Sequence, residues 1–414
     1  MTDGWSARIG DKNTSDLNSR WILVFVALCV KIIISISQYS WFLFAYSINR
    51  ELGWGLASIG LTFTFFIFAA TFVQPFSGFL ADTHGPKKVV FGASLTVGFG
   101  LILSSRAVNA VQFWIFYGVV GLGVGALNGI STAMVIKWFP DKRGFITGIV
   151  EFGFGAGTAF SNLIIQKLLL MNGFRLTFAY LGAFMWATLI PFSLFYKYPP
   201  DEWLCIFPLV NRKIAQHSLQ FKPLEMLKTY QWYLMYLSFA FTISVVLTFG
   251  AQMKMLAAEF NMPQRYFNFL LVLFPLGNGF SRIIAGAVSD SIGREKTMMI
   301  FFVLLGLSIY ILSIFGYVPA IFITAISIAS LLGGSPFVLY PATIGDYYGA
   351  KYATANYGIT ITAKAWAGLI SGWLSGFLVN EFGSYKIPLV MLSIFSLVAG
   401  LVASPRLLMP PNKY

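Results

Sequence analysis

The chain has 414 residues, of which 57% are hydrophobic and only 10% are charged. Ordinary soluble domains carry about 25% charged residues, so this composition excludes a soluble enzyme and is typical of a helical protein with many membrane spans. The net charge of +13 is not gathered in a basic helix with interleaved aromatic residues, and we expect no nucleic-acid partner. The two cysteines and two histidines are isolated in the sequence, so we expect neither a metal site nor a cofactor.

Apolar stretches long enough to cross a hydrocarbon core of about 30 Å recur twelve times along the chain. Polar residues 1–20 show no signal-peptide pattern, and we expect a disordered cytoplasmic tail there. The longest connection, 198–230, is expected to be a central cytoplasmic loop between two six-helix bundles at 21–197 and 231–404, with a second cytoplasmic tail at 405–414. The predicted spans are 21–46, 56–80, 88–105, 111–137, 144–168, 175–197, 231–253, 265–288, 297–315, 320–345, 353–379 and 385–404.

The basic residues between these spans are distributed unevenly. With both termini on one side, eighteen Lys and Arg residues lie on that side and six lie on the other. Positively charged loops stay in the cytoplasm, so the bias predicts that both termini are cytoplasmic. We therefore expect a multi-pass protein of the plasma membrane.

A loop motif occurs once in each half of the chain. Residues 78–88, after the second predicted span, and residues 286–296, after the eighth, both follow the pattern Gly-x-x-x-Asp-x-x-Gly-x-x-Lys at a separation of 208 residues. A repeat at equivalent loops indicates an internally duplicated transporter. Salt bridges from this motif between the bundles would stabilise one gated state, and the expected gating residues are Asp82, Lys87, Asp290 and Arg294.

This inner-loop motif resembles that of the major facilitator superfamily. Further blocks are similar to its oxalate:formate antiporter and monocarboxylate transporter branch. The resemblance implies an all-α membrane protein with twelve transmembrane helices in two pseudo-symmetric bundles, acting as a rocker-switch carrier for small organic carboxylates. The blocks are Gln38-Tyr39-Ser40-Trp41, Trp138 to Gly144, Asn278 with Arg282, Asn356-Tyr357-Gly358 and Ala363-Lys364-Ala365.

The resemblance also implies a substrate site. Arg282 and Lys364 match the two cations that hold the carboxylate groups in the oxalate carrier, and Tyr39 matches an aromatic pocket residue. The aromatic box of that carrier is only partly kept. At four of its other aromatic positions this chain has Asn128, Phe154, Phe337 and Ile361. The expected substrate-binding residues are Arg282, Lys364, Asn278, Tyr39, Gln38, Asn128, Phe154 and Phe337.

Charged side chains inside the spans cost about 2.5–3.5 kcal/mol each at the centre of a helix and therefore need a reason. Arg282 lies eight residues before Asp290, about 12 Å from the inner surface, and Asn278 precedes it by one turn. This fork of donors beside an amide suits a carboxylate, although pairing with backbone carbonyls is the alternative. Lys364 lies about 20 Å beyond Lys351, and the predicted spans of the second half contain no carboxylate, which favours an exogenous anion.

Lys31 and Glu151 lie at a similar depth, about 15 Å from the inner face, in the first and fifth predicted spans. One interpretation is an ion pair that offsets the cost of both charges. The other is that Glu151 is a protonatable coupling site. Glycines at four-residue spacing further predict close helix contacts in two spans, at Gly144, Gly148, Gly153 and Gly157 and at Gly368, Gly372 and Gly376.

The charges of the four residues expected at the centre of the site sum to +2: Lys31, Arg282 and Lys364 are positive and Glu151 is negative. A dicarboxylate would neutralise them, whereas a monocarboxylate would leave +1, which suits anion exchange or proton symport through a basic site. We favour a proton-coupled carrier of monocarboxylates such as lactate or pyruvate, because Phe154 and Phe337 add apolar wall to the site. Oxalate:formate-type exchange is the alternative.

Other classes of protein fit the sequence less well. An embedded enzyme would need paired carboxylates, a nucleophile with its base or a metal cluster, and the predicted spans contain none, so we expect no enzyme. A channel would not need a loop motif repeated in both halves, so the repeat favours a transporter over a channel. The expected partners are a small organic carboxylate, protons or a counter-anion, and the lipid bilayer, and we expect a monomer.

Overall fold

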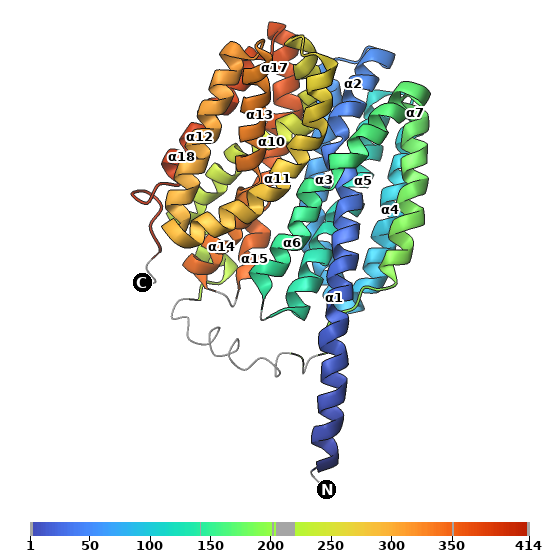
Figure 1. Ribbon diagram of the computed structural model, residues 1–414, viewed down its shortest axis with the longest axis vertical. Coiled ribbons are helices and arrows are strands. Elements are labelled where there is room, and N and C mark those ends of the chain that lie inside the picture. Colours follow the sequence, from blue (N-terminus) through green and yellow to red (C-terminus); the bar gives the residue numbers. More distant parts are fainter. Residues whose placement is uncertain (1–2, 141, 201–202, 204–219, 350–351, 412–414) are drawn as a thin grey trace.

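The computed structural model describes residues 3–140, 142–200, 203, 220–349 and 352–411. Within these ranges all regular secondary structure is helical. The helices run along the long axis of the molecule in two groups that stand side by side, α1–α7 and α10–α18 (Figure 1). The ends of the described chain point toward the same end of the molecule, which we call the termini end; the opposite end is the far end (Figure 1).

The first half crosses the body six times. Its fifth and sixth crossings are joined in one continuous stretch, Gly144–Ser193, whose 50 residues would span about 75 Å as a single helix. Gly173 divides this stretch, because its φ of 68° is open to glycine and interrupts the helix. The helices of this half are α1 (Asp3–Tyr39), α2 (Trp41–Leu52), α3 (Leu56–His84), α4 (Pro86–Arg106), α5 (Ala110–Trp138), α6 (Arg143–Ala156) and α7 (Thr158–Ser193).

The second half also crosses six times, and two of its crossings are broken. The tenth consists of α13 and α14, and the eleventh contains a π-helical turn, η2, between short α-helices. The elements are α9 (Pro223–Met226), α10 (Tyr230–Glu259), α11 (Gln264–Ile292), α12 (Arg294–Phe315), α13 (Pro319–Gly333), α14 (Pro336–Tyr348), α15 (Ala353–Thr360), α16 (Ala363–Leu369), η2 (Ile370–Leu374), α17 (Ser375–Phe382) and α18 (Lys386–Val402).

Nine helices in the described chain are long and apolar enough to cross a membrane. One of these nine holds two crossings, and the interrupted eleventh crossing and the short α18 are not among them. The predicted twelve transmembrane helices in two six-helix bundles are therefore confirmed.

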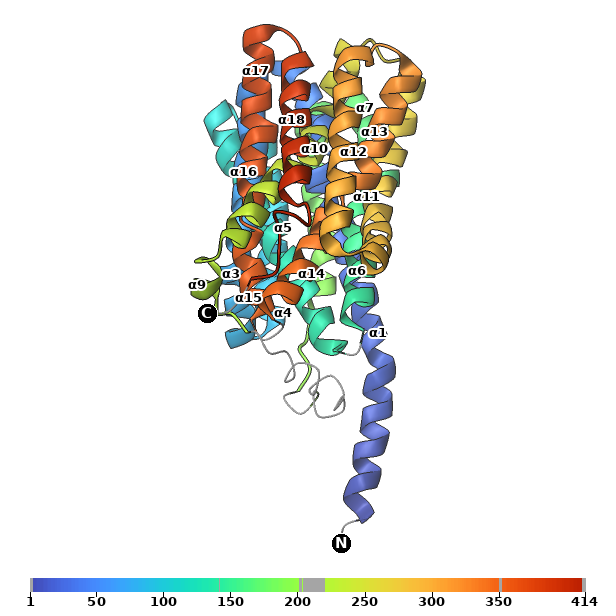
Figure 2. The ribbon, with the colours of Figure 1, turned by 90° about the vertical axis from the view of Figure 1, so that its left-hand side faces the viewer.

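The ends of the halves differ in part from expectation. Helix α1 begins at Asp3 and projects from the body in both views, so the expected disordered tail at 1–20 is wrong for residues 3–20 (Figures 1 and 2). Much of the predicted central loop, 201–202 and 204–219, lies outside the described residues, as does 412–414 of the predicted C-terminal tail.

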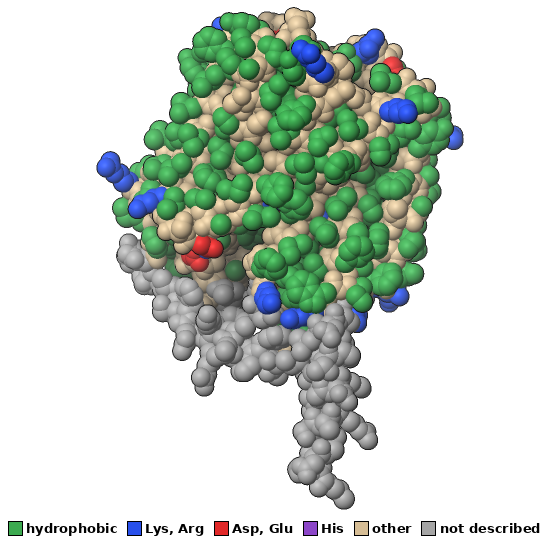
Figure 3. Space-filling view, viewed as in Figure 1, with side chains coloured by type: hydrophobic (Ala, Val, Ile, Leu, Met, Phe, Trp, Pro, Cys, Tyr) green, Lys and Arg blue, Asp and Glu red, His purple; other side chains and the backbone are tan. Residues whose placement is uncertain are grey.

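The side chains on the outside of the body suit contact with lipid. Figure 3 shows a face covered largely by hydrophobic side chains, with few charged groups. Large apolar residues such as Phe76, Phe79 and Phe160 are each about 70% exposed or more. In water such a surface would drive aggregation, whereas lipid covers it without cost.

The two halves meet along two seams, and α2 also packs against α10. Helices α6 and α7 pack against α11, and α3 packs against α16, η2 and α17. At the first seam, a Cβ built on Gly155 would lie 2.8 Å from the Cα of Gly279. At the second, a Cβ on Gly60 would lie 2.0 Å from the carbonyl oxygen of Gly372. Only glycine allows backbones to approach this closely.

The glycine spacing predicted these contacts in part. Gly368, Gly372 and Gly376 all face α3, and Gly153 and Gly157 face α1, so the prediction is confirmed for these five. It is wrong for Gly144 and Gly148, because a Cβ at either position would have no neighbour within 4 Å.

The halves are closed at the far end and apart at the termini end. Hydrogen bonds join them on the far side of the molecule's middle: the Leu56 N–H donates to Asn380 Oδ1, the Thr64 hydroxyl to the Gly368 carbonyl and Asn162 Nδ2 to the Leu271 carbonyl. Toward the termini end, the space beside Gly148 on α6 and Gly358 on α15 is open. The same end is hollowed between the halves in Figure 3.

Candidate functional site

Four charged side chains meet near the middle of the interface between the halves. Lys31 comes from α1 and Glu151 from α6, while Arg282 comes from α11 and Lys364 from α16. The crossing at Gly155 explains why two of them meet: α6 and α11 run in opposite directions, and Glu151 and Arg282 each lie about one turn from the crossing, toward the termini end.

Lys31 is completely buried and fully hydrogen-bonded. Its Nζ donates to Glu151 Oε1 at 2.5 Å, to Asn128 Oδ1 at 2.6 Å and to Thr132 Oγ1 at 2.8 Å. An ammonium group has three donors, so none is left for a ligand. The structure contains the ion pair that one interpretation of the sequence expected, and it uses Asn128, an expected substrate-binding residue, as a partner of Lys31.

Thr132 belongs to the same cluster and was not predicted from the sequence. Its hydroxyl accepts from Lys31 and donates to Glu151 Oε1 at 2.9 Å. The signal was available, because Thr132 follows Asn128 by four residues and so lies on the same face of α5.

Arg282 is bound to the opposite half of the molecule. Its Nη1 donates to Glu151 Oε2 at 2.7 Å and to the backbone oxygen of Glu151 at 2.6 Å. Its Nη2 lies 3.5 Å from Asn278 Oδ1, and its guanidinium carbon lies 4.9 Å from the centre of the Phe337 ring. The bond to the Glu151 carbonyl is the backbone pairing that the sequence left as the alternative for Arg282, and the ion pair with the Glu151 carboxylate was not expected.

Lys364 is the cation of the cluster that has no carboxylate within ion-pair distance in the described part of the chain. The residue is 95% buried, and its Nζ donates to Gln38 Oε1 at 3.0 Å. The rings of Phe154 and Phe337 lie on either half, each with its centre 5.9 Å from Nζ. A single amide oxygen satisfies one of three donors, so this ammonium group retains capacity for an anion.

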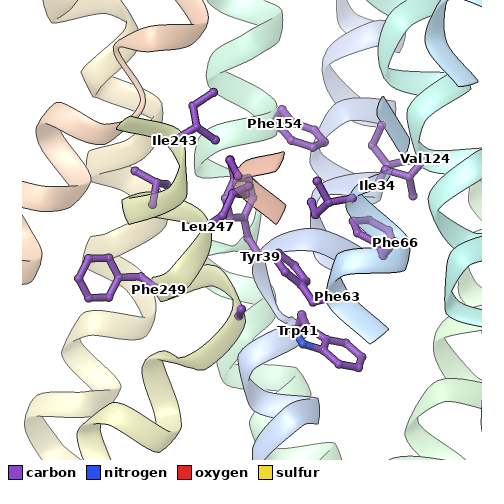
Figure 4. Packing of buried hydrophobic residues seen from close by; sticks show 14 of the residues in the cluster. Ile34, Tyr39, Trp41, Phe63, Phe66, Val124, Phe154, Ile243, Leu247 and Phe249 are labelled. Carbon is purple, nitrogen blue, oxygen red and sulfur yellow. The ribbon is translucent and has the colours of Figure 1, made fainter. Parts of the chain in front are cut away.

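Aromatic side chains form the wall of the site. The rings of Tyr39 and Phe154 meet edge to face at 5.6 Å, and the Phe154 ring also lies 5.6 Å from Lys31 Nζ. Tyr39 packs between the halves, with a ring carbon 3.7 Å from a Cβ built on Gly250 of α10. Figure 4 shows Tyr39 and Phe154 among apolar residues of both halves, including Leu247.

Several buried donors around the cations have no hydrogen bond of normal geometry among the described residues. They are Gln38 Nε2, the Tyr39 hydroxyl, Asn278 Nδ2 and Arg282 Nε, and the Tyr39 hydroxyl lies near enough to interact with both Arg282 and Gln38. Leaving a buried donor unsatisfied costs about 1–3 kcal/mol, so a group of them indicates a place for an acceptor. Together with Lys364, the donor set fits a small anion with several oxygen atoms.

The loop-motif residues make their ion pairs within one half. Asp82 pairs with Lys137 of α5 at 2.6 Å. Arg294 pairs with Asp290 at 2.6 Å and with Asp346 of α14 at 3.3 Å. We expected salt bridges between the bundles from Asp82, Asp290 and Arg294. In this conformation their ion pairs lie within one half instead.

Lys87, the remaining motif residue, lies elsewhere. It lines a groove at the termini end together with Ile22 of α1 and with Leu194 and Lys197 after α7. Within the described ranges it makes no ion pair, so this conformation gives it no gating contact.

Comparison with known proteins agrees with this geometry. A sequence profile described as the Major Facilitator Superfamily matches residues 23–253 and 232–413. The oxalate:formate antiporter of Oxalobacter formigenes is 28% identical over 97% of this chain and 96% of its own length. The probable sulfoacetate transporter SauU of Cupriavidus necator is 26% identical over 92% of this chain and 91% of its own.

Solved structures show the same fold. The inward-open xylose transporter XylE of E. coli superimposes with a TM-score of 0.70 at 13% identity, covering 93% of this chain and 95% of that one. The nucleoside transporter NupG gives a TM-score of 0.69 at 12% identity, covering 92% and 98%. These relatives and structural neighbours are transporters and not enzymes. Because the family profile matches nearly the whole length and the helices form the expected two bundles, the chain belongs to the Major Facilitator Superfamily and is a multi-pass membrane transporter.

Proposed function

We propose that the protein is a secondary active transporter that moves small organic carboxylates across the plasma membrane by alternating access. The observation that carries the proposal is Lys364, a buried cation with one amide partner, beside Arg282 Nε and other unsatisfied donors. A carboxylate offers two oxygens and about four lone pairs, which suits two cations and a set of free N–H and O–H groups.

The names of two relatives support an anionic substrate. One is called an oxalate:formate antiporter and another a probable sulfoacetate transporter, and both names refer to organic anions. Each aligns with more than nine-tenths of this chain, so the region that contains the site is included.

The substrate we favour is a monocarboxylate with a short apolar end. Phe154 and Phe337 flank Lys364 at equal distances and offer apolar surface beside the charge. For proton symport, one proton would cross together with the monocarboxylate and leave the site with it, so that Lys364 keeps its charge in the empty protein.

Exchange of the oxalate:formate type is the second candidate. With Lys31, Arg282 and Lys364 charged and Glu151 ionised, the site carries +2, and a dicarboxylate such as oxalate would neutralise it without any proton. The name of the 28% identical relative favours this alternative. In either mode the protein would act as a monomer, since a single chain holds the whole site.

Orientation in the membrane is part of the proposal. The excess of Lys and Arg at the termini end supports a cytoplasmic location for that end, and the conformation described above would then be open to the cytoplasm. In a Cys29→Ser protein, Cys205, which lies outside the described residues, should react with a membrane-impermeant maleimide only after the cells are permeabilised. Labelling of intact cells would contradict this orientation.

Uptake into proteoliposomes tests the function. We expect saturable uptake of labelled pyruvate or lactate, stimulated by an inward proton gradient and inhibited by other monocarboxylates. Strong inhibition by oxalate alone, with stimulation by preloaded anion and not by the gradient, would support exchange instead. Absence of uptake with every carboxylate and in both modes would refute the proposal.

A further inference from the structure

Glu151 connects the two halves at the centre of the site. Its Oε1 accepts from Lys31 of the first half at 2.5 Å, and its Oε2 accepts from Arg282 of the second half at 2.7 Å. We propose that Glu151 is a built-in counter-anion that lets the carrier change conformation when no substrate is bound. The inference rests on the proposed transport function. It adds that net transport, unlike exchange, requires the empty protein to change conformation and therefore requires Glu151.

The hydrogen-bond partners of Glu151 hold its carboxylate between the cations of the two halves. Each oxygen has its own cation, and Thr132 supplies one more donor to Oε1. The side chains of Lys31 and Arg282 are completely buried, whereas that of Glu151 is 15% exposed. Glu151 is thus the member of the triad that retains some exposed surface.

The substrate does not have to displace Glu151. The carboxylate of Glu151 occupies Nη1 of Arg282, while Nε has no partner and Nη2 has only the long contact with Asn278. A planar guanidinium can bind one carboxylate along one edge and a second along another. Removing the charge of Glu151 therefore leaves the substrate-facing edge of Arg282 in place.

Counting charges shows what Glu151 changes. In the empty protein Lys31, Arg282, Lys364 and Glu151 sum to +2. Without the charge on Glu151 the sum is +3, carried by cations from both halves. When the halves close and water leaves, buried like charges are costly, so the conformational change of the empty protein is slowed. A monocarboxylate bound without a proton returns the sum to +2, and this loaded protein can still change conformation.

The experiment measures two fluxes in the same proteoliposomes. Net uptake is measured with no anion inside, and exchange is measured with the unlabelled carboxylate preloaded. We expect Glu151→Gln to lower net uptake at least tenfold more than it lowers exchange, each tenfold equalling about 1.4 kcal/mol of barrier. Glu381→Gln, an exposed residue at the far end, is the matched control and should change neither flux.

A double variant separates electrostatics from folding. Lys31→Met together with Glu151→Gln removes one cation and one anion, so the sum returns to +2 and net uptake should recover relative to Glu151→Gln alone. No recovery, or equal effects of Glu151→Gln on both fluxes, would overturn the inference. Exchange without net uptake by the unsubstituted protein would also overturn the inference, but the proposal that the protein transports carboxylates would still stand. If the unsubstituted protein moves no carboxylate in either assay, the proposed function itself fails, and the inference fails with it.

Discussion

Arg282 illustrates what a single side chain contributes to the site. Two donors of one nitrogen hold it to Glu151 across the interface, and its remaining edge lies beside Asn278 and the Phe337 ring. Lysine would keep the charge, but it has no planar fork and could not serve both the fixed carboxylate and a substrate. The shape of the guanidinium, as well as its charge, is therefore used.

This argument predicts the effect of Arg282→Lys. Carboxylate uptake should fall at least tenfold, which corresponds to a loss of about 1.4 kcal/mol or more. Arg265→Lys, an exposed arginine at the far end, is the control and should transport normally. If Arg282→Lys transports at a rate near that of the unsubstituted protein, Arg282 has only a structural role.

The sequence predicted the depth of these charges but not their partners. Lys31 and Glu151 were placed at equal depth by counting residues from the loops, and they do pair. The bond from Arg282 to Glu151 was not predicted, because it joins two residues that lie 131 positions apart in different halves. Residue counting gives height along a helix, whereas the facing direction depends on where α6 and α11 cross.

At the scale of helices, small residues decide where the halves can touch. The α6–α11 crossing depends on Gly155 and Gly279, since a Cβ on Gly155 would overlap the backbone of Gly279 and a Cβ on Gly279 would overlap Cβ of Ala156. The spacing of glycines indicated close packing in both seams. It could not separate Gly153, which faces Leu28, from Gly148, which faces open space, because the pattern does not specify the neighbour.

The crossing gives a prediction on stability. Gly155→Val should destabilise the protein by about 1–3 kcal/mol through overpacking and should reduce uptake by separating Glu151 from Arg282. Thermal unfolding of the detergent-purified protein measures the first effect. Gly148→Val, in the same helix, has space for its side chain and is the control. Equal melting temperatures for the two variants would contradict the role given to Gly155.

At the scale of the whole molecule, the contacts between the halves describe one end-state of a carrier. The far end is closed by contacts such as that of Gly55 with Asn380, and the termini end is apart. The sequence predicted twelve spans and a duplicated loop motif. It did not predict the state: Asp82 and Arg294 pair within their own halves here, which pattern alone could not decide.

Locking the far end tests alternating access. A Cβ on Gly55 would lie 3.1 Å from Asn380 Nδ2 and 4.0 Å from its Cγ, so cysteines at these two positions should be joined by a short bis-methanethiosulfonate reagent. In a background without Cys29 and Cys205, the cross-link should abolish uptake, and reduction should restore it. Full transport by the cross-linked protein would show that the far end does not have to open.

Direct binding tests the central claim, that Lys364 and Arg282 together bind a carboxylate. Labelled pyruvate should bind the purified protein saturably, lactate should compete, and lactamide, which has the same shape but no carboxylate, should not. In Lys364→Gln the affinity should fall at least tenfold, or about 1.4 kcal/mol. Equal competition by lactamide, or unchanged affinity in Lys364→Gln, would contradict the account.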